Sequence, residues 1–318
     1  MEISHQSLLA DRYDYLKEKL QEPCSPPALF LAEALREKFP GAAILLYGSA
    51  GSVMSDAPAT DVLFDFYVVA PSYKAAYRSP ILRWANAMLP PNVFYLTRPS
   101  PEGMLRAKYA VISLRAFKRR LSARAFHSYF WGRFAQPFKV VSGTADEVNA
   151  MARLAANAID VFVERSAPLA HLDGMTAEDA IKAIWRAGLS ASYRAELRAE
   201  KPGRAAELLA SYGDWPQHVT ILDQHKTSRP DDRLRWRARQ GWRVRSALGG
   251  VLSILRLLKA TFTFRGGVDY IVWKIQRHAG VVVPVKNWER RYPFLAAPLL
   301  AARYYRLRRQ DRRRANTG

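Results

Sequence analysis

Short apolar runs and amphipathic stretches alternate over the first third of the chain. Runs of roughly four to eight residues that are rich in β-branched and aromatic side chains and end at turn residues are typical of buried strands. Apolar residues at helical spacing over 7–38, with a break at Pro26-Pro27, and over 73–88 predict helices before and between them. This order predicts an α/β domain over residues 1–120. We expect its strands at Ile44 to Tyr47, Val62 to Val69, Asn92 to Leu96 and Ala107 to Ser113.

The pattern becomes helical after Leu114. Apolar residues then recur three and four positions apart, which is the period of a helix with one buried face. We expect a helical domain over 121–215 and, because the next stretch is polar and contains Pro216 and Pro230, a linker over 216–244. Residues 245–318 are basic and apolar together, which predicts a basic amphipathic C-terminal region that faces a membrane. Helices are expected at Leu114 to Trp131, Ala145 to Arg165, Thr176 to Leu189 and Arg204 to Tyr212.

The chain of 318 residues carries a formal net charge of +21. Such an excess predicts an anionic partner, which could be nucleic acid, an acidic membrane surface or a phosphorylated substrate. The single cysteine, Cys24, excludes an internal disulfide and a cysteine-based zinc site, and it fits a reducing compartment. The chain begins without the build of a signal peptide and has no run of roughly 18 apolar residues. We therefore expect a soluble or peripheral protein.

The candidate chemistry gathers around the first two predicted strands. Gly48-Ser49 follows the first strand, and a turn of small residues there exposes backbone N–H groups and a hydroxyl that can hold phosphate oxygens. Asp65 lies within an otherwise apolar strand, where a carboxylate is costly to bury unless a metal or a basic side chain faces it. Asp61 stands at the start of the same strand, and together the two acids could hold the Mg²⁺ that phosphates bring. The pattern predicts a nucleotidyltransferase-like α/β domain, with its acids spaced Asp-x-x-x-Asp where Asp-x-Asp is usual.

Short segments between residues 43 and 278 follow one another in the order of a known set of motifs. They are Tyr47-Gly48-Ser49-Ala50, Phe64-Asp65-Phe66, Val93-Phe94-Tyr95, Lys108-Tyr109-Ala110-Val111, Gly132 to Pro137 and Leu189 to Arg198. In this order they resemble the mitochondrial-type phosphatidate cytidylyltransferases, also called CDP-diacylglycerol synthases or mitochondrial translocator assembly and maintenance proteins. Arg256, Lys259 and Tyr270 to Lys274 resemble the C-terminal helix of that family. A histidine-containing segment that the family carries after the acidic strand has no counterpart here.

The resemblance implies transfer of a cytidylyl group from CTP to phosphatidic acid, which yields CDP-diacylglycerol and pyrophosphate. Because the attacking phosphate is already an anion, the enzyme would need positioning and charge neutralisation more than a base. Catalytic roles are implied for Asp65, Lys108 and Asp61, with Mg²⁺ held by the two acids. The implied nucleotide-binding residues are Tyr47, Gly48, Ser49 and Lys108. The implied phosphate-binding or lipid-binding residues are Arg133, Lys139, Tyr193, Arg198, Arg256, Lys259 and Lys274.

Within residues 245–278, five basic side chains and a tyrosine fall in one narrow sector of a helical projection, Arg265 lies off it, and apolar side chains fill the other faces. This favours an interfacial helix whose basic stripe meets an anionic bilayer, and hence a peripheral protein on the cytoplasmic face of the cell membrane. The alternative is a helix packed on the core with one solvated face. The stripe consists of Arg245, Arg256, Lys259, Tyr270, Lys274 and Arg277.

Two alternative functions stay open at this point. A nucleotidyltransferase that acts on RNA or on another phosphorylated acceptor would explain the net charge equally well, although the resemblance favours a lipid over nucleic acid as partner. A membrane-associated relative that has lost catalysis would explain the missing Asp-x-Asp pair and the missing histidine segment. For Lys108, the alternative to a role at the site is a strand-edge lysine that discourages aggregation.

Overall fold

The computed structural model describes most of the chain. The described residues are 5–48, 58–196, 203–222, 232–263, 268, 272, 283–291, 296, 298–300 and 302–307.

One mixed sheet of five strands lies at the centre, in the order β3-β4-β2-β1-β5. β2 and β4 pair in parallel, whereas the other neighbours pair antiparallel. The four predicted strands are confirmed, and the fifth was not predicted because its short apolar run lies between Pro137 and Gly143 within a region of helical spacing. The strands are β1 (Ala43–Tyr47), β2 (Leu63–Ala70), β3 (Asn92–Ser100), β4 (Gly103–Ser113) and β5 (Phe138–Ser142).

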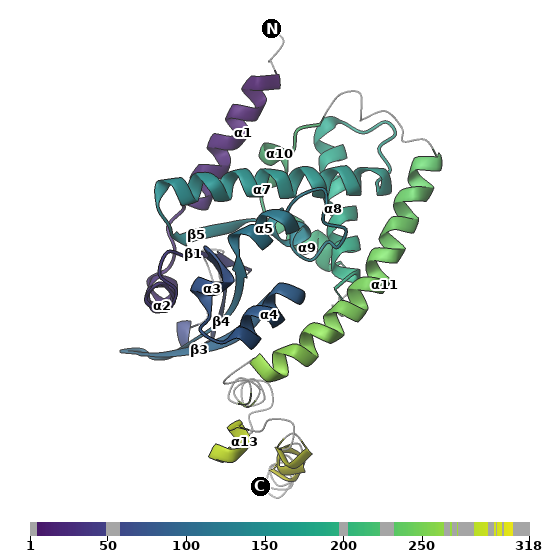
Figure 1. Ribbon diagram of the computed structural model, residues 1–318. Helices are drawn as coiled ribbons and strands as arrows, with labels where there is room; N and C mark the ends of the chain where they lie inside the picture. Colours follow the sequence, from purple (N-terminus) through teal and green to yellow (C-terminus); the bar gives the residue numbers. More distant parts are fainter. Residues whose placement is uncertain are drawn as a thin grey trace, which may run out of the picture.

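Helices cover both faces of the sheet (Figure 1). Around the sheet are α1 (His5–Leu20), α2 (Pro26–Lys38), η1 (Ala59–Asp61), α3 (Tyr73–Ala76), α4 (Pro80–Met88), α5 (Leu114–Arg120) and α6 (Trp131–Phe134). The later helices are α7 (Ala145–Ser166), η2 (Ala167–Leu169), α8 (Ala177–Arg194), α9 (Arg204–Ser211), α10 (Trp215–Val219), α11 (Asp232–Thr263) and α13 (Asn287–Arg291). The observed architecture is therefore an α/β sheet domain with extensive helical parts.

Alternation along the strands divides the core into two layers. On β2, Phe64, Phe66 and Val68 pack on the side of α2. Tyr67 and Val69 pack on the other side, under α1, α5, α6, α7 and α8. This second core also includes Trp242 of α11, so it crosses the boundary predicted at residue 120. The sheet and the helices of the predicted middle domain share one core.

The continuous helix predicted from Leu114 to Trp131 is wrong, because α5 ends at Arg120 and α6 begins at Trp131. Side chains from distant elements bind the carbonyl groups of the segment between them. Arg165 donates to the carbonyls of Ala123 and Ala125, and the Trp131 indole also donates to Ala125. These donors replace the hydrogen bonds that a helix would have supplied.

The predicted linker over 216–244 is also wrong for the part that the structure describes. Trp215 starts α10, and α11 begins at Asp232. Two tryptophans hold these helices on the core, since the Trp215 indole donates to the Ala135 carbonyl and the Trp242 indole to the Arg165 carbonyl. Both indole rings are almost fully buried. Among the described helices, none combines the length and apolar character that a membrane crossing requires.

Candidate active site

A row of polar side chains crosses the sheet on the face that carries the larger helical layer. Tyr47 of β1 lies opposite Asp65 of β2, and Asp65 lies opposite Lys108 of β4. These residues continue the alternation of Tyr67 and Val69, so they point toward the helices at the end of the strands where that core gives way to polar groups. The sheet register alone thus brings together three predicted site residues that are up to 61 positions apart in the sequence.

Lys108 is the basic side chain that faces Asp65. Its Nζ lies 2.8 Å from Asp65 Oδ1, and both side chains keep about a third of their surface exposed. Burial alone would lower the pKa of Lys108, but the oxygens of Tyr47 and Asp65 outweigh it and raise that pKa above its ordinary value. Lys108 is therefore a fixed positive charge at neutral pH. The expectation that Asp65 requires a cationic neighbour is confirmed.

Gly48 brings the turn after β1 close to Asp65. Its φ of +83° lies in the left-handed region, which glycine adopts without strain. A Cβ at this position would lie 3.7 Å from Asp65 Oδ2. Ser49, which follows it, and Arg198 lie outside the described residues, so their predicted phosphate-binding roles stay predictions.

A cavity of about 650 Å³ opens beside this row. Its walls come from β1, β2, β4 and β5 and from α1, α6, α8 and α9, and it brings Arg133, Lys139 and Tyr193 to the same space as Tyr47, Asp65 and Lys108. Five basic and five acidic side chains line it, which leaves the wall close to neutral despite the large net charge of the chain. These charged side chains are Lys19, Lys108, Arg133, Lys139, Arg204, Glu22, Asp65, Glu196, Glu207 and Asp214.

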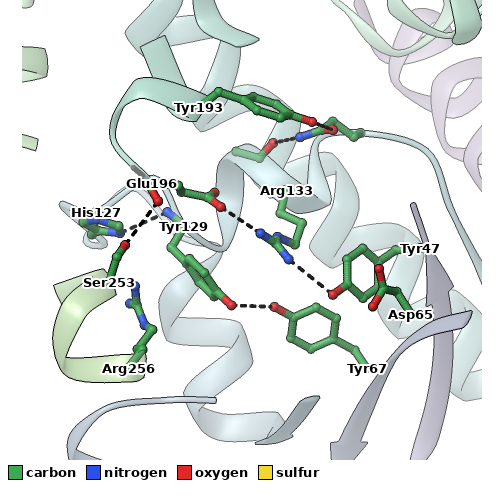
Figure 2. A network of polar contacts seen from close by, with 12 residues as sticks. Tyr47, Asp65, Tyr67, His127, Tyr129, Arg133, Tyr193, Glu196, Ser253 and Arg256 are labelled. Atoms are coloured by element: carbon green, nitrogen blue, oxygen red, sulfur yellow. Dashed lines mark hydrogen bonds and ion pairs between the residues drawn. The ribbon is translucent and has the colours of Figure 1, made fainter. Parts of the chain in front are cut away.

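Arg133 of α6 forms a buried ion pair with Glu196, which follows α8. Its Nη2 lies 2.8 Å from Glu196 Oε2, with 11% and 10% of the two side chains exposed. Its Nη1 donates to the Tyr47 hydroxyl at 3.3 Å, as Figure 2 shows. Burial raises the pKa of Tyr47 to about 12, so this hydroxyl is neutral at physiological pH. The guanidinium therefore sits between a carboxylate and a phenol at the inner end of the cavity.

Polar contacts also fix the rim of the cavity. Lys139 donates to the Pro23 carbonyl at 2.9 Å and lies 3.5 Å from Glu22. Gln136 accepts from the hydroxyls of Tyr193 and Tyr212 at 3.3 and 2.6 Å. Lys139 and Tyr193, both predicted to bind phosphate or lipid, thus line the cavity. In this structure their side chains contact protein groups.

The predicted basic residues of α11 lie away from this cavity and face the body of the protein. Arg256 Nε donates to the Pro90 carbonyl at 3.2 Å, and Lys259 Nζ donates to the carbonyls of Leu89 and Pro91. The Arg256 guanidinium stacks 4.0 Å from the centre of the Tyr129 ring (Figure 2). The prediction that these side chains project outward as a stripe is wrong for Arg256 and Lys259. Lys274 and Tyr270 lie outside the described residues.

Asp61 lies in η1, exposed, and does not line the cavity. Among the described residues, no group of three or more His, Cys, Asp or Glu side chains could hold a metal. Asp65 is the acid of the strand row, where it pairs with Lys108 as Glu196 pairs with Arg133. A single carboxylate suits Mg²⁺ that arrives with the phosphates of a nucleotide, because Mg²⁺ keeps several waters and often takes one or two carboxylates plus phosphate oxygens.

Sequence reasoning did not assign roles to Glu22, Gln136 or Tyr212, which shape the cavity. Glu22 follows α1, and it reaches Lys139 from 117 positions away in the sequence. No local pattern marks such a residue, since its role depends on how α1 packs across α7 and β5. Comparison of the chain with protein-family models finds no match, and comparison with curated proteins finds none either.

Proposed function

We propose that this protein is a Mg²⁺-dependent nucleotidyltransferase that transfers a cytidylyl group from CTP to phosphatidic acid. The observation that carries the proposal is the row of Tyr47, Asp65 and Lys108 beside the Gly48 turn, at the edge of a cavity of about 650 Å³. An acid and a lysine on adjacent strands next to a glycine turn form an arrangement that suits the handling of a triphosphate. The motif order and the mixed sheet support the same proposal.

The chemistry requires charge neutralisation and alignment. A phosphate oxygen of phosphatidic acid attacks the α-phosphorus of CTP and forms a new P–O bond. The bond from the α-phosphorus to the bridging oxygen breaks, and pyrophosphate leaves with the electron pair. Lys108 offsets negative charge on the transferring group, and Arg133, paired with Glu196, lines the same cavity. The backbone at Gly48 gives the phosphates a close approach to the strand ends.

Asp65 is the side chain that would hold Mg²⁺. The ion would supply further positive charge at the phosphates, which matters because the acidic and basic side chains of the cavity balance in number. Asp65 also holds the Lys108 ammonium in the row. We assign no role to Asp61, because it lies outside the cavity lining.

The test is release of pyrophosphate by the purified protein with CTP, Mg²⁺ and phosphatidic acid in anionic vesicles. Asp65→Asn should lower the rate by about 100-fold or more. It should change the free energy of unfolding by only about 1 kcal/mol, because the Asp65–Lys108 pair is partly exposed. Asp146→Asn, at an exposed position in the first turn of α7, is the matched control and should behave like the parent.

Three outcomes would overturn the proposal. No pyrophosphate release would favour a relative without catalysis, in which the Asp65–Lys108 pair is only structural. Release that Asp65→Asn leaves unchanged would show that the reaction does not use the strand row. Pyrophosphate release that requires RNA instead of phosphatidic acid, with salt-sensitive RNA binding, would favour the nucleotidyltransferase with a different acceptor.

A further inference from the structure

α4 carries its apolar side chains on the outside. Ile81, Trp84 and Met88, which share one face of this helix, are 75%, 68% and 64% exposed. On the opposite face Asn86 is fully buried, and its amide donates to the Tyr77 hydroxyl and to the Val111 carbonyl, each at 2.8 Å. These two hydrogen bonds fix the rotation of the helix. The exposed apolar face, called here the α4 face, is therefore set by the fold.

α11 presents a second apolar face to the outside. Its inner side carries Trp242, Arg245 and Arg256, which contact the body of the protein. The outward side chains are 45% to 57% exposed and recur at helical spacing. They are Val244, Leu248, Val251, Ile254, Leu255 and Leu258, called here the α11 face.

The two helices are neighbours. Arg256 and Lys259 of α11 bind the carbonyls of Leu89, Pro90 and Pro91, which directly follow α4. Figure 1 shows α4 beside the last turns of α11. The α4 and α11 faces therefore lie near each other, at one corner of the molecule (Figure 1).

The chain around α4 is strongly basic. From residue 66 to residue 100 the sequence holds Lys74, Arg78, Arg83 and Arg98 and no acid. Lys74 and Arg78, a few positions before α4, are exposed. A second copy of the chain would bring the same excess of positive charge to the contact, and a nucleic acid would leave the α4 face in water. An anionic bilayer pairs with the cations and also takes up the apolar side chains.

We propose that the α4 face inserts into the interfacial layer of an anionic lipid bilayer, with the α11 face beside it. Trp84 suits this depth, because indole rings favour the boundary between headgroups and hydrocarbon. The inference goes beyond the proposed reaction, since it concerns how the protein docks and is tested by binding without CTP.

The experiment is co-sedimentation of the full chain with vesicles of phosphatidylcholine and phosphatidylglycerol, against vesicles of phosphatidylcholine alone. The triple variant Ile81→Ser, Trp84→Ser, Met88→Ser should lose about tenfold or more of its partitioning to anionic vesicles. The matched control is Leu29→Ser, Met104→Ser, Met175→Ser, which removes exposed apolar side chains from other surfaces and should bind like the parent. Circular dichroism checks that both variants fold.

Fluorescence gives a second readout that a folding defect would not mimic. Brominated lipids should quench the tryptophan fluorescence of the parent more than that of the Trp84→Phe variant. Equal quenching of the two proteins, or equal vesicle binding by the parent and the α4 triple variant, would overturn the inference. So would a dimer that the triple variant abolishes, because the α4 face would then meet a second copy.

Turnover separates this inference from the proposed function. The α4 triple variant should keep the parent's rate on a short-chain soluble phosphatidate and lose rate on vesicles. A protein that binds vesicles through the α4 face but never releases pyrophosphate would refute the reaction and support the docking surface. A variant that loses rate equally on both substrates would overturn the docking inference.

Discussion

Glu196 is expected to stabilise the protein mainly by compensating the buried charge of Arg133. The two groups are 2.8 Å apart, and about nine-tenths of each side chain is buried. Removing one partner of a buried pair leaves an uncompensated charge and typically costs about 3–5 kcal/mol. The Arg133 guanidinium would keep the rings of Tyr47 and Tyr129 at 5.3 and 4.8 Å. We therefore expect the low end of that range, about 3 kcal/mol, for Glu196→Gln.

Urea unfolding of the parent, Glu196→Gln, Arg133→Met and the double variant Arg133→Met/Glu196→Gln measures this directly. The double variant should be destabilised by less than the sum of the single changes, because no buried charge is left without a partner. Glu207→Gln is the matched control, since Glu207 lines the same cavity but pairs with Arg204 in an exposed ion pair. It should change stability by about 0.5 kcal/mol or less. A Glu196→Gln protein within about 1 kcal/mol of the parent, at an unchanged denaturant slope, would refute the reasoning.

Three further predictions concern the contact between α11 and the body. Burial and nearby arginines lower the pKa of His127 from 6.5 to about 4, so the unfolded state binds more protons between these values. The free energy of unfolding should therefore fall as the pH is lowered between these two values. The urea midpoint of His127→Gln should fall less than that of the parent over the same range. Burial and Arg256 lower the pKa of Lys259 from 10.5 to about 7, so stability should rise with pH between these values. The slope should be at most about 1.4 kcal/mol per pH unit, and Lys259→Met should flatten it. A Cβ at Gly249 would lie 2.0 Å from the Ala195 carbonyl oxygen, so Gly249→Ala should lower stability by about 2 kcal/mol in thermal melts. Gly241→Ala should not lower stability in this way, because the nearest atom there is the mobile end of the Arg245 side chain.

Local sequence patterns predicted the strands that build the site. Short apolar runs predicted β1, β2, β3 and β4, and the place of Asp65 within an apolar strand required a cationic neighbour, which the structure identifies as Lys108. Asp65 and Lys108 are neighbours because β2 and β4 pair in parallel. Sequence patterns indicate strands but not their order in a sheet, so the partner of Asp65 is identified only by the structure.

Contacts between distant segments were beyond prediction. The Arg133–Glu196 pair spans 63 positions, and the break after α5 depends on Arg165, some 40 positions further along the chain. In both cases the contact joins groups that are far apart in the sequence, so no local pattern marks it. Helical periodicity over Leu114 to Trp131 was present, but distant donors satisfied the backbone carbonyls of the intervening segment and removed the need for a helix.

α11 shows most clearly what periodicity leaves undecided. A helical projection separates basic from apolar sectors, but either sector can face the body. Here the inner sector holds Arg245, Arg256 and Lys259, which donate to carbonyl groups of the loop after α5 and of the segment after α4. Burial lowers the pKa values of all three, so this orientation stabilises the charged forms less than solvent would. It also leaves the α11 face in contact with water, where the hydrophobic effect opposes it. The second of these penalties disappears if the α11 face meets hydrocarbon, so the bilayer that the α4 face implies also accounts for the apolar outer side of this helix.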